Sequence, residues 1–313
     1  MNSSWIDKYS VQQFDDFIGN EHVRNSLQNM TESNQFNHLI LIGPEGVGKK
    51  TLISLVLKSY QIDFDHENVL FLRMCEDRSI QCLRERFHEF VPKKTAVYKF
   101  IIIQHAEMIT EGVQHMMRRL MDKYVQSTIF IFLCKQLNGV LDCIRSRSLI
   151  FYMSGFSYEE YSKKIKYVLQ NEEVQIESSE DLKLLYHYSK GNLRYTFQYL
   201  ELLACYCSTD KKISQDLLKK LCICPYYSIL EDIVKAIDNS NIYDCYQYIY
   251  SLRKLGLHAI DIIFLIKESF LIYRLSPTFT EKINRHFCIV YSQIAKYGEN
   301  ILFILYFLIK LME

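Results

Sequence analysis

The sequence has no excess of charge of either sign and no apolar segment long enough to cross a bilayer. Its 313 residues include 37 Lys and Arg and 36 Asp and Glu, which gives a formal net charge of +1. A nearly neutral chain has no overall attraction for nucleic acid, so any DNA-binding surface must be a local patch. The longest apolar run, residues 301–309, is about half of a bilayer span and ends at Lys310. We expect a buried helix there and no membrane partner.

Signals for secretion and for structural zinc are also missing. The first ten residues contain no apolar core of the kind found in signal peptides. The ten cysteines are scattered through helical patterns, which favours reduced thiols. Two C-x-C pairs occur, at Cys205/Cys207 and Cys222/Cys224. Zinc knuckles use two to four residues between cysteines, and Cys205 lies in an apolar helical run, so we expect no metal site.

Residues 36–152 alternate strand-like and helix-like patterns. Five apolar runs have the length of strands and are rich in β-branched and aromatic residues: HLILIG, NVLFLRM, KFIIIQ, TIFIFLC and LIFYM. Amphipathic stretches such as KKTLISLVLKSY separate them. This order predicts an α/β domain with a doubly wound parallel sheet flanked by helices. Only helical patterns follow, so we predict domains at 1–153, 154–212 and 213–313, the last two α-helical.

The stretch GPEGVGKKT resembles a phosphate-binding loop, with one departure. The usual pattern is G-x-x-x-x-G-K-[ST], in which backbone N–H groups surround phosphates, the Lys adds charge and the hydroxyl binds Mg²⁺. Gly43, Gly48 and Lys49 match it, but Lys50 replaces the hydroxyl residue. The loop follows a predicted strand and opens a predicted helix, the context its chemistry requires. The candidate nucleotide-binding residues are Gly43, Pro44, Glu45, Gly46, Val47, Gly48, Lys49, Lys50 and Thr51.

Six motifs together resemble the small subunits of replication factor C, the eukaryotic sliding-clamp loader of the AAA+ class. They are WIDKY (5–9), DDFIGNE (15–21), GPEGVGKKT (43–51), MMRRLMDKY (116–124), IRSRS (144–148) and GNLR (191–194). The resemblance covers residues 1 to about 207. It implies an AAA+ nucleotide-binding domain, an α-helical lid and an α-helical collar that joins the subunits of a hetero-pentamer. It also implies three kinds of partner, namely other replication factor C subunits, the sliding clamp PCNA and primer-template DNA, and residence in the nucleus.

The departures from the family pattern concern hydrolysis. Active members place an Asp-Glu pair where this chain has Gln104 and His105, and a sensor Asn where it has Lys135. Gln104 is a poor ligand for Mg²⁺, which prefers carboxylate and phosphate oxygens. Together with Lys50, these changes predict a subunit that is not an ATPase on its own and has no Mg²⁺ at its own site. The GKKT spelling resembles one small subunit of that complex that is usually described as not hydrolysing ATP.

Nucleotide binding is expected to survive these changes. The loop amides and Lys49 remain, and Arg194 matches the lid arginine of the family's G-[DN]-x-R pattern, so ADP or ATP is the expected cofactor, with ADP favoured. We hypothesise that Lys50 replaces part of the missing metal charge. The alternative is an empty loop with Lys50 in solvent. The family's K-Y-R-P is Lys8-Tyr9-Ser10-Val11 here, which leaves adenine recognition open.

Two further sites follow from the resemblance. Arg147 stands where the family's Ser-Arg-Cys motif supplies an arginine finger to the neighbouring subunit's ATP. The alternative for Arg147 is a surface salt bridge. On the predicted helix 78–90, Arg84, Arg86 and His88 match positions that contact duplex phosphates, and a solvated helix face is the alternative there.

The predicted function is that of a non-hydrolysing clamp-loader subunit that helps load PCNA onto primed DNA. Two other functions stay open. One is an ATP-hydrolysing AAA+ subunit with unusual catalytic residues. The other is a bacterial-type clamp-loader stator, although residues 43–152 lack the cysteine spacing of that protein's zinc module.

Overall fold

The chain divides into two compact units. The computed structural model describes residues 4–73, 80–92, 98–176, 178–207, 212–222, 227–273 and 277–312. Contacts between its elements separate residues 1–214 from residues 215–313. The boundary expected at residue 153 therefore falls inside the first unit, and the division into three domains stays a prediction.

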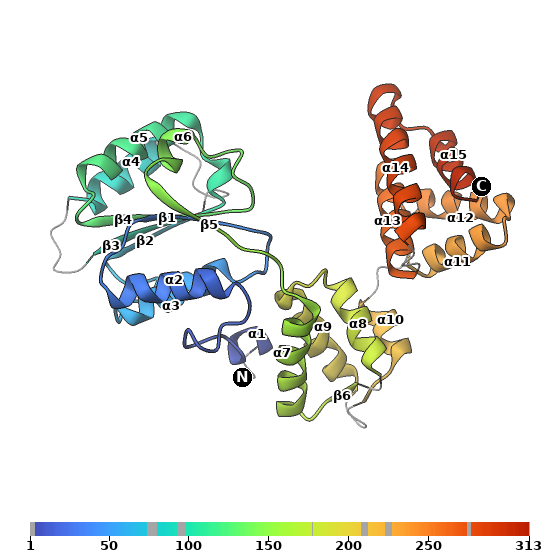
Figure 1. The fold of residues 1–313 in the computed structure, drawn as a ribbon, viewed down its shortest axis with the longest axis horizontal. Coiled ribbons are helices and arrows are strands. Elements are labelled where there is room, and N and C mark those ends of the chain that lie inside the picture. Colours follow the sequence, from blue (N-terminus) through green and yellow to red (C-terminus); the bar gives the residue numbers. More distant parts are fainter. Residues whose placement is uncertain are drawn as a thin grey trace. The chain divides into compact units, whose positions relative to one another are not determined.

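A five-stranded parallel sheet forms the centre of the first unit, in the order β2-β3-β4-β1-β5 (Figure 1). Its strands are β1 (His38–Ile42), β2 (Val69–Arg73), β3 (Lys99–Gln104), β4 (Thr128–Cys134) and β5 (Ser148–Tyr152). All five lie on the apolar runs that predicted them, so the expected α/β sheet is confirmed. β1 and β5 are in register from His38 and Ser148 at their starts to Ile42 and Tyr152 at their ends.

Alternation along each strand gives the sheet two apolar faces. In β1, Leu39 and Leu41 belong to one core, and Ile40 and Ile42 belong to the other. Successive side chains of a strand point to opposite faces, so a run that is apolar throughout must be covered on both. One face is covered by α2 (Glu21–Glu32) and α3 (Lys49–Ser59). The other is covered by α4 (Ile80–Phe90), α5 (Glu111–Lys123) and α6 (Asp142–Arg145).

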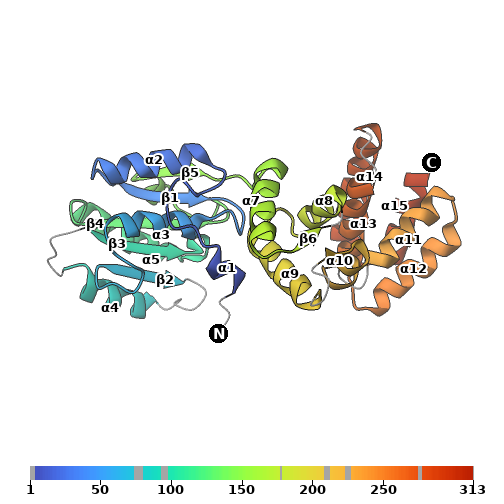
Figure 2. The ribbon, with the colours of Figure 1, turned by 90° about the horizontal axis from the view of Figure 1, so that it is seen from below.

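The rest of the first unit is mainly helical. Its elements are α1 (Trp5–Lys8), η1 (Ala106–Met108), α7 (Tyr158–Asn171), β6 (Gln175–Ile176), α8 (Ser179–Tyr188), α9 (Leu193–Tyr206) and β7 (Lys212–Ile213). α7 begins with a capping box in which the Ser157 and Glu160 side chains satisfy backbone N–H groups. The short α1 lies against the lid helix α9, as Figures 1 and 2 both show. The β6–β7 pairing was not predicted, because two-residue strands are too short to show a period.

The second unit consists of helices in its described part, as predicted. They are α10 (Gln215–Cys222), α11 (Tyr227–Asp238), α12 (Ile242–Lys254), α13 (Ala259–Tyr273), α14 (Pro277–Tyr297) and α15 (Ile301–Met312). α15 contains the longest apolar run and places one face in the core through Ile304, Phe307, Leu308 and Leu311. Among the described helices, none combines the length and the apolar content that a membrane span needs. The described part of the chain thus has a parallel sheet flanked by helices, followed by further helices, as the sequence predicted.

Candidate nucleotide site

The loop between β1 and α3 has the backbone of an anion-binding loop. Gly46 and Gly48 adopt left-handed φ values of 79° and 89°, which glycine adopts at little cost. Gly48 is the N-cap of α3, so the first N–H groups of that helix have no partner within it. Free N–H groups and the positive end of the helix dipole make this loop suited to phosphate.

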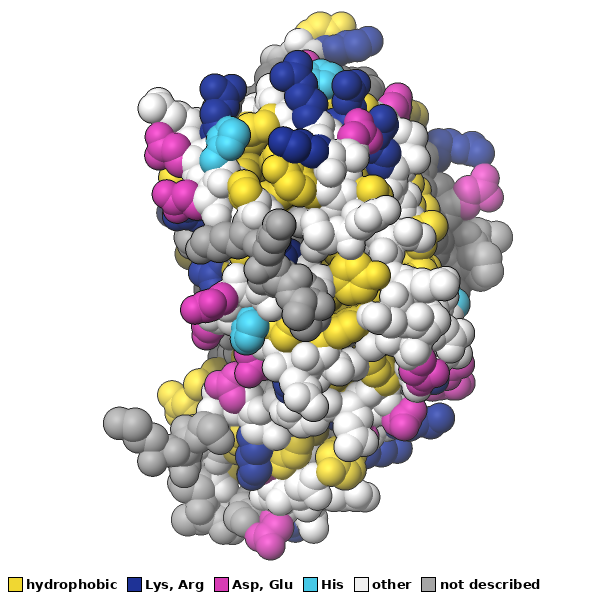
Figure 3. Space-filling view, turned by 90° about the vertical axis from the view of Figure 1, so that its left-hand side faces the viewer, with side chains coloured by type: hydrophobic (Ala, Val, Ile, Leu, Met, Phe, Trp, Pro, Cys, Tyr) yellow, Lys and Arg dark blue, Asp and Glu magenta, His cyan; other side chains and the backbone are white. Residues whose placement is uncertain are grey.

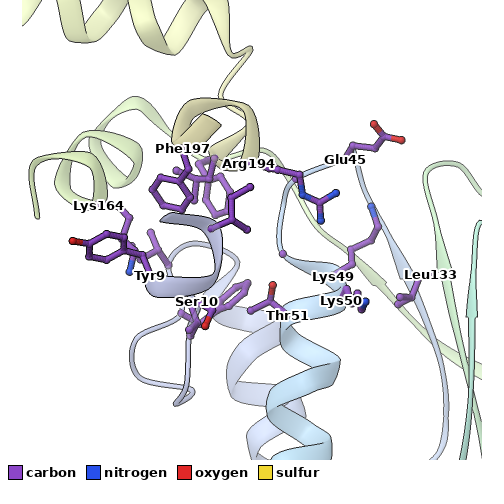
Figure 4. Close-up of a pocket in the computed structure, with 18 of the residues that line it drawn as sticks. Tyr9, Ser10, Glu45, Lys49, Lys50, Thr51, Leu133, Lys164, Arg194 and Phe197 are labelled. Carbon is purple, nitrogen blue, oxygen red and sulfur yellow. The ribbon is translucent and has the colours of Figure 1, made fainter. Parts of the chain in front are cut away.

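A cavity of about 410 Å³ lies beside this loop. The N-terminal segment, the ends of β3 and β4, and the lid all line it (Figure 4). Seven of the predicted nucleotide-binding residues line the cavity: Glu45, Gly46, Gly48, Lys49, Lys50, Thr51 and Arg194. Gly43, Pro44 and Val47 are not among its lining residues, and Val47 is buried in the core. The structure therefore brings most of this predicted site together.

Three cationic residues, Lys49, Lys135 and Arg194, line the cavity beside the loop. The Lys49 ammonium donates hydrogen bonds to the carbonyl oxygens of Gly43 and, at 2.8 Å, Pro44. Burial lowers the pKa of Lys49 from its ordinary value. Arg194, in the first turn of α9, extends from the lid toward the loop (Figure 4). Positive charge from the loop, the sheet and the lid therefore faces one cavity.

Lys50 has two aromatic neighbours. Its ammonium lies 5.0 Å from the ring centroid of Phe64 and 4.9 Å from that of Phe71, within the range of cation–π attraction. Burial, and then the charges of Arg73 and Arg194, lower the pKa of Lys50. Lys50 is nevertheless an exposed residue, so the alternative of an empty loop with Lys50 in solvent stays open. The hypothesis that it replaces metal charge stays a prediction.

Glu107 supplies a carboxylate near the ends of β3 and β4. One of its oxygens accepts a hydrogen bond from the Lys135 backbone N–H at 3.3 Å, and the other lies 3.5 Å from His105 Nδ1. Both partners line the cavity, and Glu107 itself lies just behind these lining residues. At the family's Mg²⁺ positions, Lys50 and Gln104 still provide neither a hydroxyl nor a carboxylate. Those two side chains do not fit the ion.

The lid is tied to the N-terminal segment through Glu172. One oxygen of this carboxylate lies 2.5 Å from both the Tyr9 hydroxyl and the Lys8 ammonium. Burial first, and then the Glu172 hydrogen bond, raise the pKa of Tyr9 to about 12. The Tyr9 ring also packs near Phe197 of the lid. Sequence reasoning missed Glu172, because it belongs to none of the motifs.

No profile of a known protein family matches the chain. Over 219 residues it is 30% identical to "Replication factor C small subunit 2" of Pyrobaculum islandicum, covering 69% of this chain and 67% of that one. The chain belongs to the replication factor C small-subunit family. It is also 27% identical over 265 residues to "Probable replication factor C subunit 5" of Dictyostelium discoideum, covering 83% of this chain and 76% of that one. A RuvB structure titled "Holliday junction branch migration motor", from Thermotoga maritima, shares its fold alone, with a TM-score of 0.55, 17% identity, and coverage of 72% and 79%.

Family membership corrects one expectation. The expectation that this replication factor C subunit is not an enzyme on its own is wrong, because its family is one of AAA+ ATPases and points to ATPase activity. The physical reason is that phosphoryl transfer depends mainly on positioning and on charge. The cavity keeps Lys49 and Arg194, and the structure adds the nearby Glu107 carboxylate. The expectation of an inactive subunit rested on the number of altered motif residues and did not take into account the charged groups around them.

Arg147 lies at the other end of the sheet from this cavity. It directly precedes β5, whose first residue, Ser148, pairs with His38 at the start of β1. Its guanidinium donates to both Asp122 oxygens, at 2.6 and 3.3 Å, and to the Cys143 carbonyl oxygen at 3.0 Å. The predicted alternative, a surface salt bridge, is therefore present. Asp122 was not predicted as its partner.

The predicted DNA-contact residues lie on α4. Leu83 and Phe87 are buried in the core, and Arg84, Arg86 and His88 are exposed. The prediction had the helix begin at Arg78, and residues 78 and 79 lie outside the described part of the chain. In Figure 3, Lys and Arg side chains gather at the upper end of the face, the end where α5 and α6 lie in Figure 1. DNA contact stays a prediction.

Proposed function

We propose that this replication factor C subunit takes part in a pentameric clamp loader that places the ring-shaped sliding clamp on primed DNA. It binds adenine nucleotide in the cavity beside residues 43–51, and it supplies Arg147 to the nucleotide site of the neighbouring subunit. The observation that carries the proposal is the placement of Arg147 and the phosphate-binding loop at opposite ends of the same two strands.

This placement favours action on another molecule. Arg147 precedes the start of β5, and the loop follows the end of β1, four residue steps along paired parallel strands. At roughly 3.3 Å per residue, the strands alone separate them by about 13 Å. We infer that Arg147 acts on a nucleotide held by another subunit and not on one held by this loop. Asp122 accepts from Nε and Nη2, and Cys143 and Ser146 accept from Nη1, which leaves the second Nη2 hydrogen for a phosphate.

We further propose that the bound nucleotide is ADP or ATP and that its binding depends little on Mg²⁺. The side chains of Lys49, Lys135 and Arg194 face the cavity with positive charge, while Lys50 and Gln104 do not fit the ion. Titration of the purified chain with ATP and ADP, in Mg²⁺ and in EDTA, tests this part. A loss of all affinity in EDTA contradicts it.

The decisive experiment is ATP turnover by the reconstituted complex carrying Arg147→Ala. Turnover at the neighbouring site is expected to fall by about 10³-fold or more, as for other arginine fingers. Lys163→Ala is the control, because Lys163 is an exposed cation on α7 that is not among the residues lining the cavity. Unchanged turnover in a fully assembled Arg147→Ala complex contradicts the proposal.

A further inference from the structure

The phosphate-binding loop holds two ammonium groups with its own oxygens. Lys49 donates to the Gly43 and Pro44 carbonyl oxygens. The Lys135 ammonium lies 2.5 Å from Glu45 Oε1. Phosphate oxygens would compete for the same two cations. The phosphate oxygens of a bound nucleotide therefore have to replace the loop oxygens as partners of these ammonium groups.

The sheet holds Lys135 beside the start of the loop. Lys135 follows Cys134, the last residue of β4, and Cys134 pairs with Ile42, the last residue of β1. The Gly43 N–H donates to the Cys134 carbonyl oxygen at 3.2 Å, which continues this pairing into the loop. The Lys135 N–H, in turn, donates to Glu107 at 3.3 Å. The backbone of Lys135 is thus fixed next to the loop, and its long side chain can change partners.

Glu45 places a negative charge on a loop built for anions. The hydrogen bond and charge of Lys135 come first among the causes that lower the pKa of Glu45, with smaller effects from His105 and Lys49. Glu45 is therefore ionised at neutral pH, and it lines the cavity. A free carboxylate there repels phosphate, and a paired one occupies the cation that phosphate needs.

We propose that the Glu45–Lys135 ion pair is an autoinhibitory contact, which the terminal phosphate of a nucleoside triphosphate opens by displacing Glu45 from Lys135. Lys135 thereby favours triphosphate over diphosphate, and its pairing with Glu45 lowers that preference. This inference rests on the proposed nucleotide site and names its regulation.

The exposure of the pair makes the exchange feasible. The side chains of Lys135 and Glu45 are 46% and 52% exposed, and ion pairs of such exposure contribute little stability. A triphosphate carries more negative charge than either a carboxylate or a diphosphate, so it competes better for the ammonium. If the Glu45–Lys135 pair were an ordinary surface ion pair, its loss would leave nucleotide affinity unchanged.

Calorimetric titration of the full chain with ATP and with ADP tests the proposal without any need for turnover. Lys135→Gln is expected to weaken ATP binding about tenfold, a typical effect of losing one charged contact, and to leave ADP binding within about twofold. Glu45→Gln is expected to tighten ATP binding several-fold, because it removes the competitor. Lys135→Arg keeps the charge and is expected to keep the preference for ATP.

The controls separate this inference from the proposed site. Lys163→Gln and Glu159→Gln remove exposed charges on α7 and are expected to change neither affinity. Lys49→Met is expected to weaken both nucleotides. If Lys49→Met does so while neither Lys135→Gln nor Glu45→Gln alters the ATP-to-ADP ratio, the site stands and the autoinhibitory contact is overturned. A wild-type chain with no affinity for either nucleotide overturns both. Thermal unfolding of each variant shows whether it is folded.

Discussion

Arg147 and Asp122 form a two-point ion pair, with Nε 2.6 Å from Oδ1 and Nη2 3.3 Å from Oδ2. The pair joins the start of β5 to the last turn of α5. It raises the pKa of Arg147 and lowers that of Asp122, so both groups are charged at neutral pH. A planar guanidinium held along one edge has a fixed direction. Asp122 is therefore placed to orient the proposed arginine finger.

Asp122→Asn is expected to lower ATP turnover of the assembled complex by about 10-fold to 100-fold, with little change in KM for ATP. The amide keeps the size of the side chain, but it loses the charge and one of the two acceptors. Steady-state kinetics of the reconstituted complex measures this. Asp122→Glu should recover part of the turnover. Asp142→Asn, which alters another Asp–Arg pair nearby, is the control. A role in folding alone would change assembly and leave the turnover of assembled complexes unaltered.

Gly46→Ala is expected to lower the free energy of unfolding by about 1–2 kcal/mol and to weaken nucleotide binding. Gly46 has a φ of 79°, and an added Cβ would lie 2.0 Å from Asn192 Oδ1, at the N-cap of α9. The substitution therefore strains the loop and pushes the lid away. Urea denaturation and nucleotide titration measure the two effects. Gly155→Ala is the matched control, since its added Cβ has no neighbour within 4 Å. Equal behaviour of the two variants contradicts the expectation.

Lys99→Met is expected to destabilise the first unit by about 1–3 kcal/mol. The Lys99 side chain is 2% exposed, and its ammonium donates to the Phe90 and Val91 carbonyl oxygens at 2.9 Å each. Methionine fills similar space but leaves the carbonyl groups at the end of α4 without these donors. Chemical denaturation checks the value. Lys123→Met, at an exposed site, should change stability by less than about 0.5 kcal/mol.

The Cys134 thiol is expected to resist alkylation at pH 8 in the folded chain. Burial first, and then the nearby charge of Glu107, raise the pKa of Cys134 from 9.0 to about 11, so the reactive thiolate is scarce. Mass spectrometry after iodoacetamide treatment should find Cys205 and Cys288, which are exposed, modified first. Early modification of Cys134 contradicts this.

Above pH 9 the Cys134 thiol ionises in the unfolded chain before it does so in the folded chain, so this group lowers the free energy of unfolding as pH rises from 9 to about 11.

Arg84→Ala in the assembled loader is expected to weaken binding to primed DNA about equally for all sequences. Loss of one phosphate contact should reduce the slope of log K against log salt by about one unit. Fluorescence anisotropy at several salt concentrations measures the slope. A slope that stays the same, as in the Lys163→Ala control, favours a solvated helix face for α4.

Much of the first unit could be predicted from local patterns. The apolar runs that form β1 to β5 are covered on both faces of the sheet. Their composition predicts this, because a strand that is apolar throughout has to be buried on both sides. Likewise, the glycines of residues 43–48 mark the loop before any fold is known. The motifs between Trp5 and Arg194 were enough to indicate the family that sequence relatives confirm.

Sequence patterns were weaker on what the site does. The altered residues at positions 50, 104, 105 and 135 led to a wrong expectation about enzyme activity. Their effect depends on which charged groups lie nearby, and the sequence does not contain that information. One such group is Glu107, whose carboxylate the short η1 turn brings to the backbone N–H of Lys135.

The sequence by itself determined the strands, the loop, the helical lid and collar, and the chain's family, because these follow from composition and spacing within short segments. Only the tertiary structure decided which distant side chains meet. The pairs Glu45 with Lys135, Arg147 with Asp122, and Tyr9 with Glu172 are separated along the chain by 25 to 163 residues. Such pairs depend on strand order and on how helices cover the sheet, and no local pattern specifies either one.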